Sequence, residues 1–142
     1  MLEPNCSVDM LKCILFNARS LGNKLLELHH LLYTADHDIV LVTESCLDSS
    51  ITSALLDPQN KFCVIRNDRN RNGGGVCALV SKQIQICKVD VDKPFDHLEI
   101  LCFDVVCHPS NLRFTLVYRP PSSGVESDAC LIWLSFSNRT TD

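Results

Sequence analysis

Two polar residues, Asn17 and Glu44, directly follow short apolar runs of the sequence and are the first candidates for chemistry. The runs are 12–16 and 39–42, and both have the length and composition of buried strands. At the carboxyl ends of neighbouring strands in an open α/β sheet, an amide and a carboxylate face one crevice, which is where such sheets bind ligands. A lone carboxylate there holds Mg²⁺ only with help from other oxygen ligands. On spacing alone, a role for both residues in starting and capping turns is the favoured alternative.

A second candidate is the arginine-rich loop, residues 66–72 (RNDRNRN), which three consecutive glycines follow. Its arginines, with Asp68 between Arg66 and Arg69, form the one local basic patch and suit contacts to phosphate groups. The glycines permit a tight turn into the next strand, but no helix is expected after them, so the block is not a dinucleotide-binding motif. A solvated hairpin loop explains the local sequence about as well.

The third candidate lies where the last clear strand meets two prolines, in residues 117–121 (VYRPP). Tyr118 can hydrogen-bond a phosphate oxygen, and Arg119 can pair with one. Taken alone, the segment is better explained as a strand that the prolines end.

The elements that must position these residues begin with a strand–helix–strand unit. Leu21, Leu25, Leu28 and Leu32 fall on one face of an amphipathic helix of about four turns, for which Ser20 is the predicted cap. Because this helix joins the two apolar runs, their strands should be parallel. Five strand-like segments follow, at 62–66, 75–81, 84–91, 98–106 and 112–118. From these patterns alone we expect an α/β protein with a largely β second part.

Composition narrows the class of protein. The chain has 142 residues, of which 46% are apolar, so a globular domain with its own core is expected. No apolar run approaches the ~20 residues that span a bilayer, and the N-terminus lacks the features of a secretory signal. We therefore expect no membrane contact and an intracellular location, in the nucleus or cytoplasm. The nine cysteines include no CxxC pair, which favours buried thiols over a zinc site. The net charge of -4 gives no independent support for nucleic-acid binding.

Taken together and in this order, the motifs resemble the endonuclease/exonuclease/phosphatase superfamily, and most closely the endonuclease domain of LINE-type (non-LTR) retrotransposons. The motifs are Asn-Ala-Arg-Ser at 17–20, Thr-Glu-Ser at 43–45, the arginine and glycine block at 66–75, and Val-Tyr-Arg-Pro-Pro at 117–121. Each motif is weak by itself, whereas the ordered set is specific. The resemblance covers residues 11–123 as a partial domain and leaves 124–142 as a divergent tail.

The resemblance implies a fold and an activity. The fold would be a four-layer α/β sandwich, incomplete at its C-terminus, with two sheets face to face and helices outside. The activity would be Mg²⁺-dependent hydrolysis of a phosphodiester, nicking DNA to prime reverse transcription, in a parent protein fused to a reverse transcriptase. Glu44 would be the metal ligand, Asn17 would order the metal site and the phosphate, and Tyr118 would contact the phosphate as charge builds on it. The residues assigned to phosphate or DNA binding would be Arg66, Asp68, Arg69 and Arg119.

Two departures limit the resemblance. The family usually has a Trp after Glu-Ser and before Leu-Asp, where this chain has Cys46. The family continues with a helix, a Gly-Asp-Phe-Asn strand and a terminal Ser-Asp-His, and these 142 residues contain neither motif, although residues 130–133 begin like that helix. We therefore expect a truncated domain that binds Mg²⁺ weakly and is inactive alone. The alternatives are a non-catalytic nucleic-acid-binding remnant that uses the arginine-rich loop, or another branch of the superfamily that acts on phospholipid or inositol phosphates.

Overall fold

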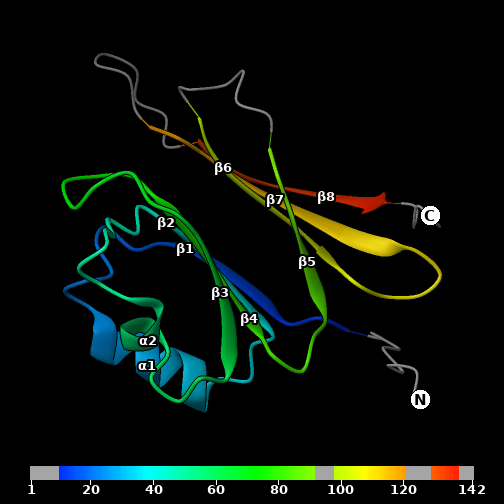
Figure 1. The fold of residues 1–142 in the computed structure, drawn as a ribbon, viewed down its shortest axis with the longest axis horizontal. Coiled ribbons are helices and arrows are strands. Elements are labelled where there is room, and N and C mark those ends of the chain that lie inside the picture. The colour runs from blue at the N-terminus through cyan, green and yellow to red at the C-terminus, as the bar shows by residue number, and fades with distance from the viewer. Residues whose placement is uncertain (1–9, 92–97, 121–128, 138–142) are drawn as a thin grey trace.

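A computed structural model of the chain describes residues 10–91, 98–120 and 129–137, with the backbone alone for 129–133 and 137. Within these residues, eight strands form two four-stranded sheets that face each other (Figure 1). Both described helices lie against the outer face of the first sheet. No helix in the described ranges is long and apolar enough to cross a membrane.

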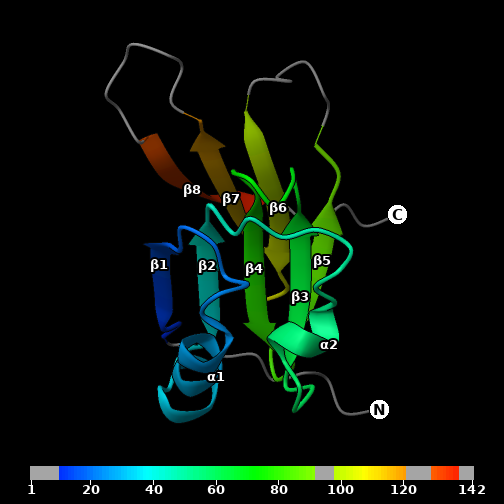
Figure 2. The ribbon, with the colours of Figure 1, turned by 90° about the vertical axis from the view of Figure 1, so that its left-hand side faces the viewer.

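Sheet 1 contains β1 (Cys13–Asn17), β2 (Ile39–Thr43), β3 (Phe62–Asn67) and β4 (Val76–Ser81), in the order β1-β2-β4-β3 (Figure 2). β1 and β2 are parallel, as the strand–helix–strand pattern predicted. β4 runs antiparallel to both of its neighbours. The parallel register places the last residue of β1 directly beside the last residue of β2, so these two strands end together.

The helix between β1 and β2 starts later than the leucine pattern predicted. α1 spans Leu25–Thr34, and Ser20 does not cap it because the chain around Ser20 is still turning, with a positive φ of 88°. Leu21 is nevertheless buried with the leucines of α1, because the turn before the helix returns it to the same core. A second helix, α2 (Ser53–Leu56), was not expected, since one turn is too short to produce a recognisable period.

Sheet 2 contains β5 (Ile86–Val89), β6 (Glu99–Val105), β7 (Asn111–Arg119) and β8 (Ala129–Ser137), in that order, and all of its pairings are antiparallel. The expectation that a helix begins near residues 130–133 is therefore wrong. The apolar run there is weakly patterned, and its pairing with the whole length of β7 decides that it forms a strand.

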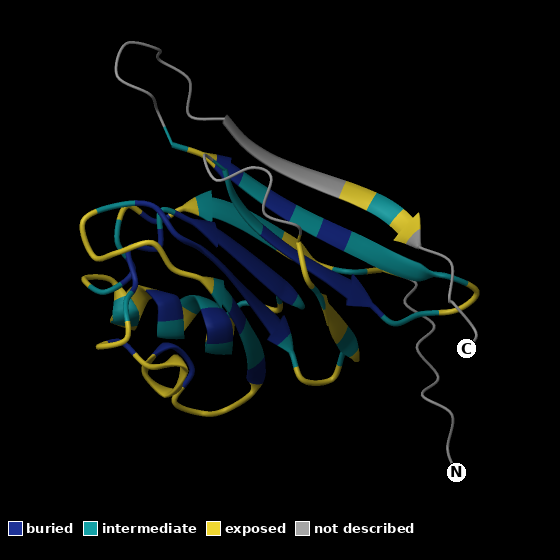
Figure 3. Cartoon of the chain, turned by 45° about the horizontal axis from the view of Figure 1, so that its top comes forward, coloured by how far each residue is buried: buried dark blue, intermediate teal, exposed yellow. Residues whose placement is uncertain are grey.

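Two cores hold the molecule together, one between the helices and sheet 1 and the other between the two sheets (Figure 3). β2 contributes to both, because side chains alternate across a strand. Val40 and Val42 pack toward the helices, whereas Ile39 and Leu41 pack toward sheet 2. Every residue of β2 is consequently buried, which makes it a rigid support for the turn that follows.

The expected four-layer α/β sandwich is wrong: the structure is mostly β, and its described helices cover sheet 1 only. The outer face of sheet 2 supplies the physical reason. On β7, Phe114 and Leu116 are buried against sheet 1, while Arg113 lies on the opposite face and pairs with Asp104 of β6 at 2.8 and 3.0 Å. A face that carries ion pairs gains little from an apolar helix packed over it.

Candidate functional site

Glu44 begins the turn that follows β2, and this turn is held from two sides. Its φ is 49°, a left-handed conformation that is uncommon for a residue with a side chain. On one side, the carbonyl of Glu44 accepts a hydrogen bond of 2.9 Å from the backbone N–H of Ser20. On the other side, Ser45 and Cys46 donate their N–H groups to the carbonyls of Gly75 and Gly74 at 3.2 and 2.9 Å. The position of Glu44 is thus fixed by backbone contacts before its side chain is considered.

Tyr118 meets Glu44 from the opposite sheet. Tyr118 is the penultimate residue of β7, its side chain faces sheet 1, and the residue is only 2% exposed. Its hydroxyl donates a short hydrogen bond to Oε1 of the Glu44 carboxylate. This bond links the two sheets at the end where β1 and β2 also finish. The structure therefore brings together two of the residues that the sequence had singled out from segments far apart in the chain.

Asn17 lies next to this pair. It is the last residue of β1 and the register partner of Thr43, which immediately precedes Glu44. Its side-chain Oδ1 accepts a hydrogen bond of 3.1 Å from the backbone N–H of Arg19, and the residue is exposed. Asn17 thus starts a turn, as the simpler interpretation held, and does so at the same edge as Glu44.

Glu99 is a fourth member of the site, and the sequence interpretation missed it. It is the register partner of Tyr118, and its side chain is only 12% exposed. Its Oε2 accepts a hydrogen bond of 2.6 Å from the N–H of Gly75, and its Oε1 lies 3.4 Å from Nε of Arg69. Burial raises the pKa of Glu99, and the nearby Glu44 carboxylate raises it further, against the opposing effects of Gly75 and Arg69. We refer to Asn17, Glu44, Glu99 and Tyr118 together as the polar corner.

A signal for Glu99 was present in the sequence. Residues 101, 103 and 105 of β6 are apolar and face sheet 1, and Glu99 has the same parity along the strand. A carboxylate in line with a buried apolar row requires partners, because an unpaired charge on that face is costly. The partners are Gly75 and Arg69, which both belong to the arginine and glycine block at 66–75.

The glycine block is therefore a clamp for the Glu44 turn. Gly74 and Gly75 both have positive φ values, 65° and 88°. A Cβ on Gly74 would lie 2.2 Å from Oε1 of Glu99, so that carboxylate can approach only a residue without a side chain. Through this approach, Glu99 holds Gly75, and Gly75 in turn holds Ser45.

Arg66 and Asp68, both expected to serve phosphate or DNA binding, are bound to each other instead. The Arg66 guanidinium contacts the Asp68 carboxylate at 2.6 and 3.2 Å. It also donates to the backbone carbonyls of Ile51 and Asp48 at 2.6 and 3.1 Å. With its side chain only 15% exposed, Arg66 braces the loop after β2 and has little capacity left for a phosphate.

The remaining arginines lie at or near the surface. Arg69 is bound to the glycine block, through the carbonyl of Gly73 at 3.1 Å and through Glu99. Arg119 is exposed and follows Tyr118 in β7, so by strand alternation it leaves the sheet on the other face. The structure consequently does not gather the four predicted phosphate-binding residues into one surface.

The donor set fits Mg²⁺ only in part. Among the described residues, no group of three or more His, Cys, Asp or Glu side chains is arranged to hold a metal ion. Glu44 offers one carboxylate, whereas both oxygens of Glu99 face donors of the glycine block and Arg69. Mg²⁺ is commonly held by one or two carboxylates together with waters and substrate phosphates, so Glu44 alone is a minimal anchor.

No protein-family model matches the chain, and no curated protein matches it.

Proposed function

We propose that these residues form part of a Mg²⁺-dependent phosphodiester hydrolase, a DNA endonuclease of the retrotransposon type, and that the polar corner is its metal- and phosphate-contacting end. DNA as the substrate and a reverse transcriptase in the parent protein belong to the same proposal. The observation that carries it is the hydrogen bond between Tyr118 and Glu44, which joins two separate motifs at the end where β1 and β2 finish.

Three residues of the polar corner have distinct parts in this proposal. Glu44 supplies the negative charge that anchors the metal. Without substrate, Tyr118 fixes the direction of that carboxylate; with substrate bound, its single hydroxyl proton would turn from Glu44 to a phosphate oxygen. The amide nitrogen of Asn17 is a second such donor, since its Oδ1 is used by Arg19. When bound, Mg²⁺ supplies Lewis acidity and neutralises the charge that builds on the phosphate.

The described residues do not complete a catalytic site by themselves. A general base that takes the proton from the attacking water is worth roughly 10²–10⁴ in rate, and the two motifs to which the resemblance assigns this role are not in these 142 residues. Glu99 is the other carboxylate of the polar corner: its Oε2 accepts from Gly75, and its Oε1 faces Arg69 at 3.4 Å without a hydrogen bond. The 142-residue chain should therefore bind metal and phosphate weakly and cleave nothing.

Plasmid nicking tests the proposal. The 142-residue chain, incubated with supercoiled plasmid and Mg²⁺, should give no detectable relaxation. The same chain extended by the in-frame residues that follow Asp142 in its gene should nick if those residues include Gly-Asp-Phe-Asn and Ser-Asp-His. Glu44→Ala should abolish that nicking, because the metal loses its anchor. Glu27→Ala is the matched control, since Glu27 is an exposed carboxylate on α1.

Metal binding gives a readout that does not depend on cleavage. Mn²⁺ bound to the 142-residue chain, counted by electron paramagnetic resonance with a short DNA duplex present, should fall in Glu44→Gln and remain in Glu27→Gln. A folded extended chain that carries both motifs and does not nick would contradict the proposal. So would nicking or Mn²⁺ binding that Glu44 substitutions leave unchanged.

A further inference from the structure

β8 forms an open edge of sheet 2. It pairs with β7 along its whole length, and no strand lies on its other side within the described part of the chain. A strand of nine residues is about 30 Å long, and an edge of that length presents a long row of backbone donors and acceptors. Such an edge is a template for pairing with another strand unless the sequence protects it.

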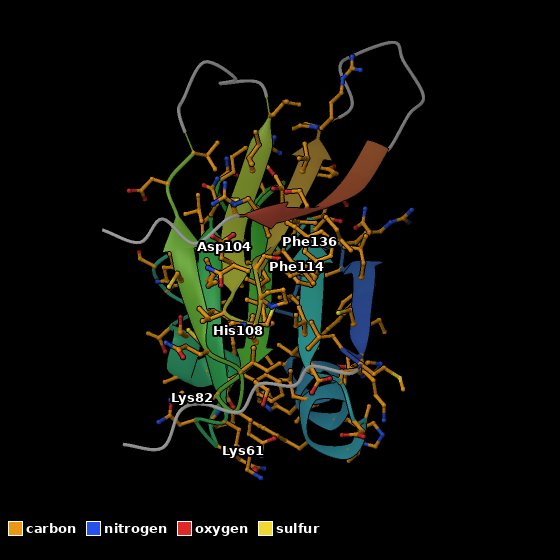
Figure 4. The ribbon with its side chains drawn as sticks, turned by 90° about the vertical axis from the view of Figure 1, so that its right-hand side faces the viewer. Lys61, Lys82, Asp104, His108, Phe114 and Phe136 are labelled. Atoms are coloured by element: carbon orange, nitrogen blue, oxygen red, sulfur yellow. The ribbon has the colours of Figure 1, made fainter. Side chains whose placement is uncertain are left out.

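The exposed side chains on β8 are apolar. Leu134 is 54% exposed and Phe136 is 78% exposed. Their register partners on β7 are Phe114 and Leu112, so both belong to the face that is turned toward sheet 1. Phe114 on β7 is only 3% exposed, whereas Phe136 on β8 is largely exposed (both labelled in Figure 4). Sheet 1 therefore buries the inner face of β7 but does not reach Phe136. At Leu134 and Phe136, the inner face of β8 therefore lies beyond the core and is uncovered.

Two of the other open edges carry a charge within the strand, Arg66 in β3 and Lys88 in β5. The remaining open edge, β1, is uncharged but has only five residues, whereas β8 has nine. Charged residues of this kind discourage pairing between edges. β8, with the sequence ACLIWLSFS, contains no charged residue and no proline. It is the longest of the open edges in the described part of the chain that can meet a copy of itself without placing like charges opposite one another.

Charged residues and prolines are frequent in the sequence segments outside the described ranges. The segments outside the described ranges are 1–9, 92–97, 121–128 and 138–142, and each contains charged residues. The first three also contain proline, and the last has only five residues.

We propose that β8 is a self-association edge, at which two copies of the chain pair antiparallel about a two-fold axis. Such an isologous contact joins identical patches, so an uncharged strand is compatible with it and a charged one is not. The pairing extends sheet 2 across the axis and places Leu134 and Phe136 of each copy beside the inner face of the partner's strand. The occupant of the open edge is thus a second copy of this chain.

Sedimentation equilibrium over a range of concentrations tests this. The unmodified chain should reach about twice the 15.9 kDa of one chain. Phe136→Lys should weaken the dimer at least about tenfold, because each dimer loses two buried aromatic groups and gains two like charges. Leu26→Lys is the matched control: Leu26 is 81% exposed but lies on α1, and this variant should dimerise as before.

Hydrogen exchange on the unmodified chain keeps the test independent of how the variants fold. The backbone amides of 129–137 should be more protected in a concentrated sample than in a dilute one, while those of β5 should not change. A chain that is monomeric at every concentration would overturn the proposal, as would large polydisperse assemblies. Equal weakening by Phe136→Lys and Leu26→Lys would overturn it as well.

Discussion

Replacing Arg66 with alanine should destabilise the fold rather than weaken a nucleic-acid contact. The guanidinium makes four hydrogen bonds, two to Asp68 and two to the backbone carbonyls of Asp48 and Ile51. With side-chain exposures of 15% and 26%, the two charged partners are largely withdrawn from water. The alanine would leave the Asp68 carboxylate and two carbonyls without their donor.

The size of the effect follows from these contacts. A hydrogen bond that involves a charged group contributes roughly 1.5–3 kcal/mol, but four bonds to one guanidinium are not additive, and the remaining exposure admits some water. We therefore expect Arg66→Ala to lower the free energy of unfolding by about 2–4 kcal/mol. With a slope of about 2 kcal/mol per molar urea, the midpoint should move by roughly 1–2 M.

Urea unfolding followed by circular dichroism measures this, and Arg71→Ala is the matched control. Arg71 belongs to the same loop, and its guanidinium donates a 3.1 Å hydrogen bond to the exposed Ser50. Its loss should change the free energy of unfolding by less than about 1 kcal/mol. If Arg66→Ala unfolds like Arg71→Ala and instead loses affinity for DNA, the reasoning is refuted and Arg66 returns to a phosphate-binding role.

Two further predictions concern the clamp around Glu44. Because burial raises the pKa of Glu99, the stability this group contributes is fully present below its ordinary value of 4.5 and is lost as the pH rises through the raised value. The melting temperature of the unmodified chain should therefore fall as the pH rises from 4.5 through the raised pKa of Glu99, and this fall should be smaller in Glu99→Gln. Identical profiles of melting temperature against pH for the two chains would contradict the prediction. Gly75→Ala should cost about 1–3 kcal/mol in urea unfolding, because φ is 88° and the new Cβ would lie 2.6 Å from Oγ of Ser45. Gly73→Ala should cost less, since its Cβ meets only the movable end of Arg69.

Local patterns predicted the part of the fold that depends on neighbouring residues. The apolar runs before Asn17 and Glu44 are strands, they are parallel, and they end together, as a strand–helix–strand unit requires. The proximity of Tyr118 to Glu44 was expected from the resemblance, and their contact is present. The catalytic roles of these residues remain predictions, because geometry alone assigns no reaction.

The errors have a common origin in long-range packing. β8 is a strand because β7 lies beside it, and its own sequence shows no clear period. No described helix covers the outer face of sheet 2, where Asp104 pairs with Arg113. This pairing is visible only when β6 and β7 are placed in register. Similarly, Arg66 binds the backbone carbonyls of Ile51 and Asp48, which lie 15 and 18 residues away in the sequence. The arginine-rich loop therefore contains an arginine that stabilises the fold, although its sequence resembles a basic surface patch.

The contacts of Glu44 distinguish two roles for this residue, one as the cap of a turn and one as part of a binding site. A capping carboxylate accepts a hydrogen bond from a backbone N–H close to it in sequence. The partner of the Glu44 carboxylate is instead the hydroxyl of Tyr118, 74 residues away in the other sheet.

The backbone of Glu44 is also strained. Its positive φ costs about 1 kcal/mol and persists only where surrounding contacts enforce it. Here Ser20, Gly74 and Gly75 enforce it through the backbone, leaving the carboxylate itself directed at Tyr118. A turn that served only to reverse the chain would be satisfied by glycine or asparagine at this position. A glutamate held there against its conformational preference is better explained by what its side chain does.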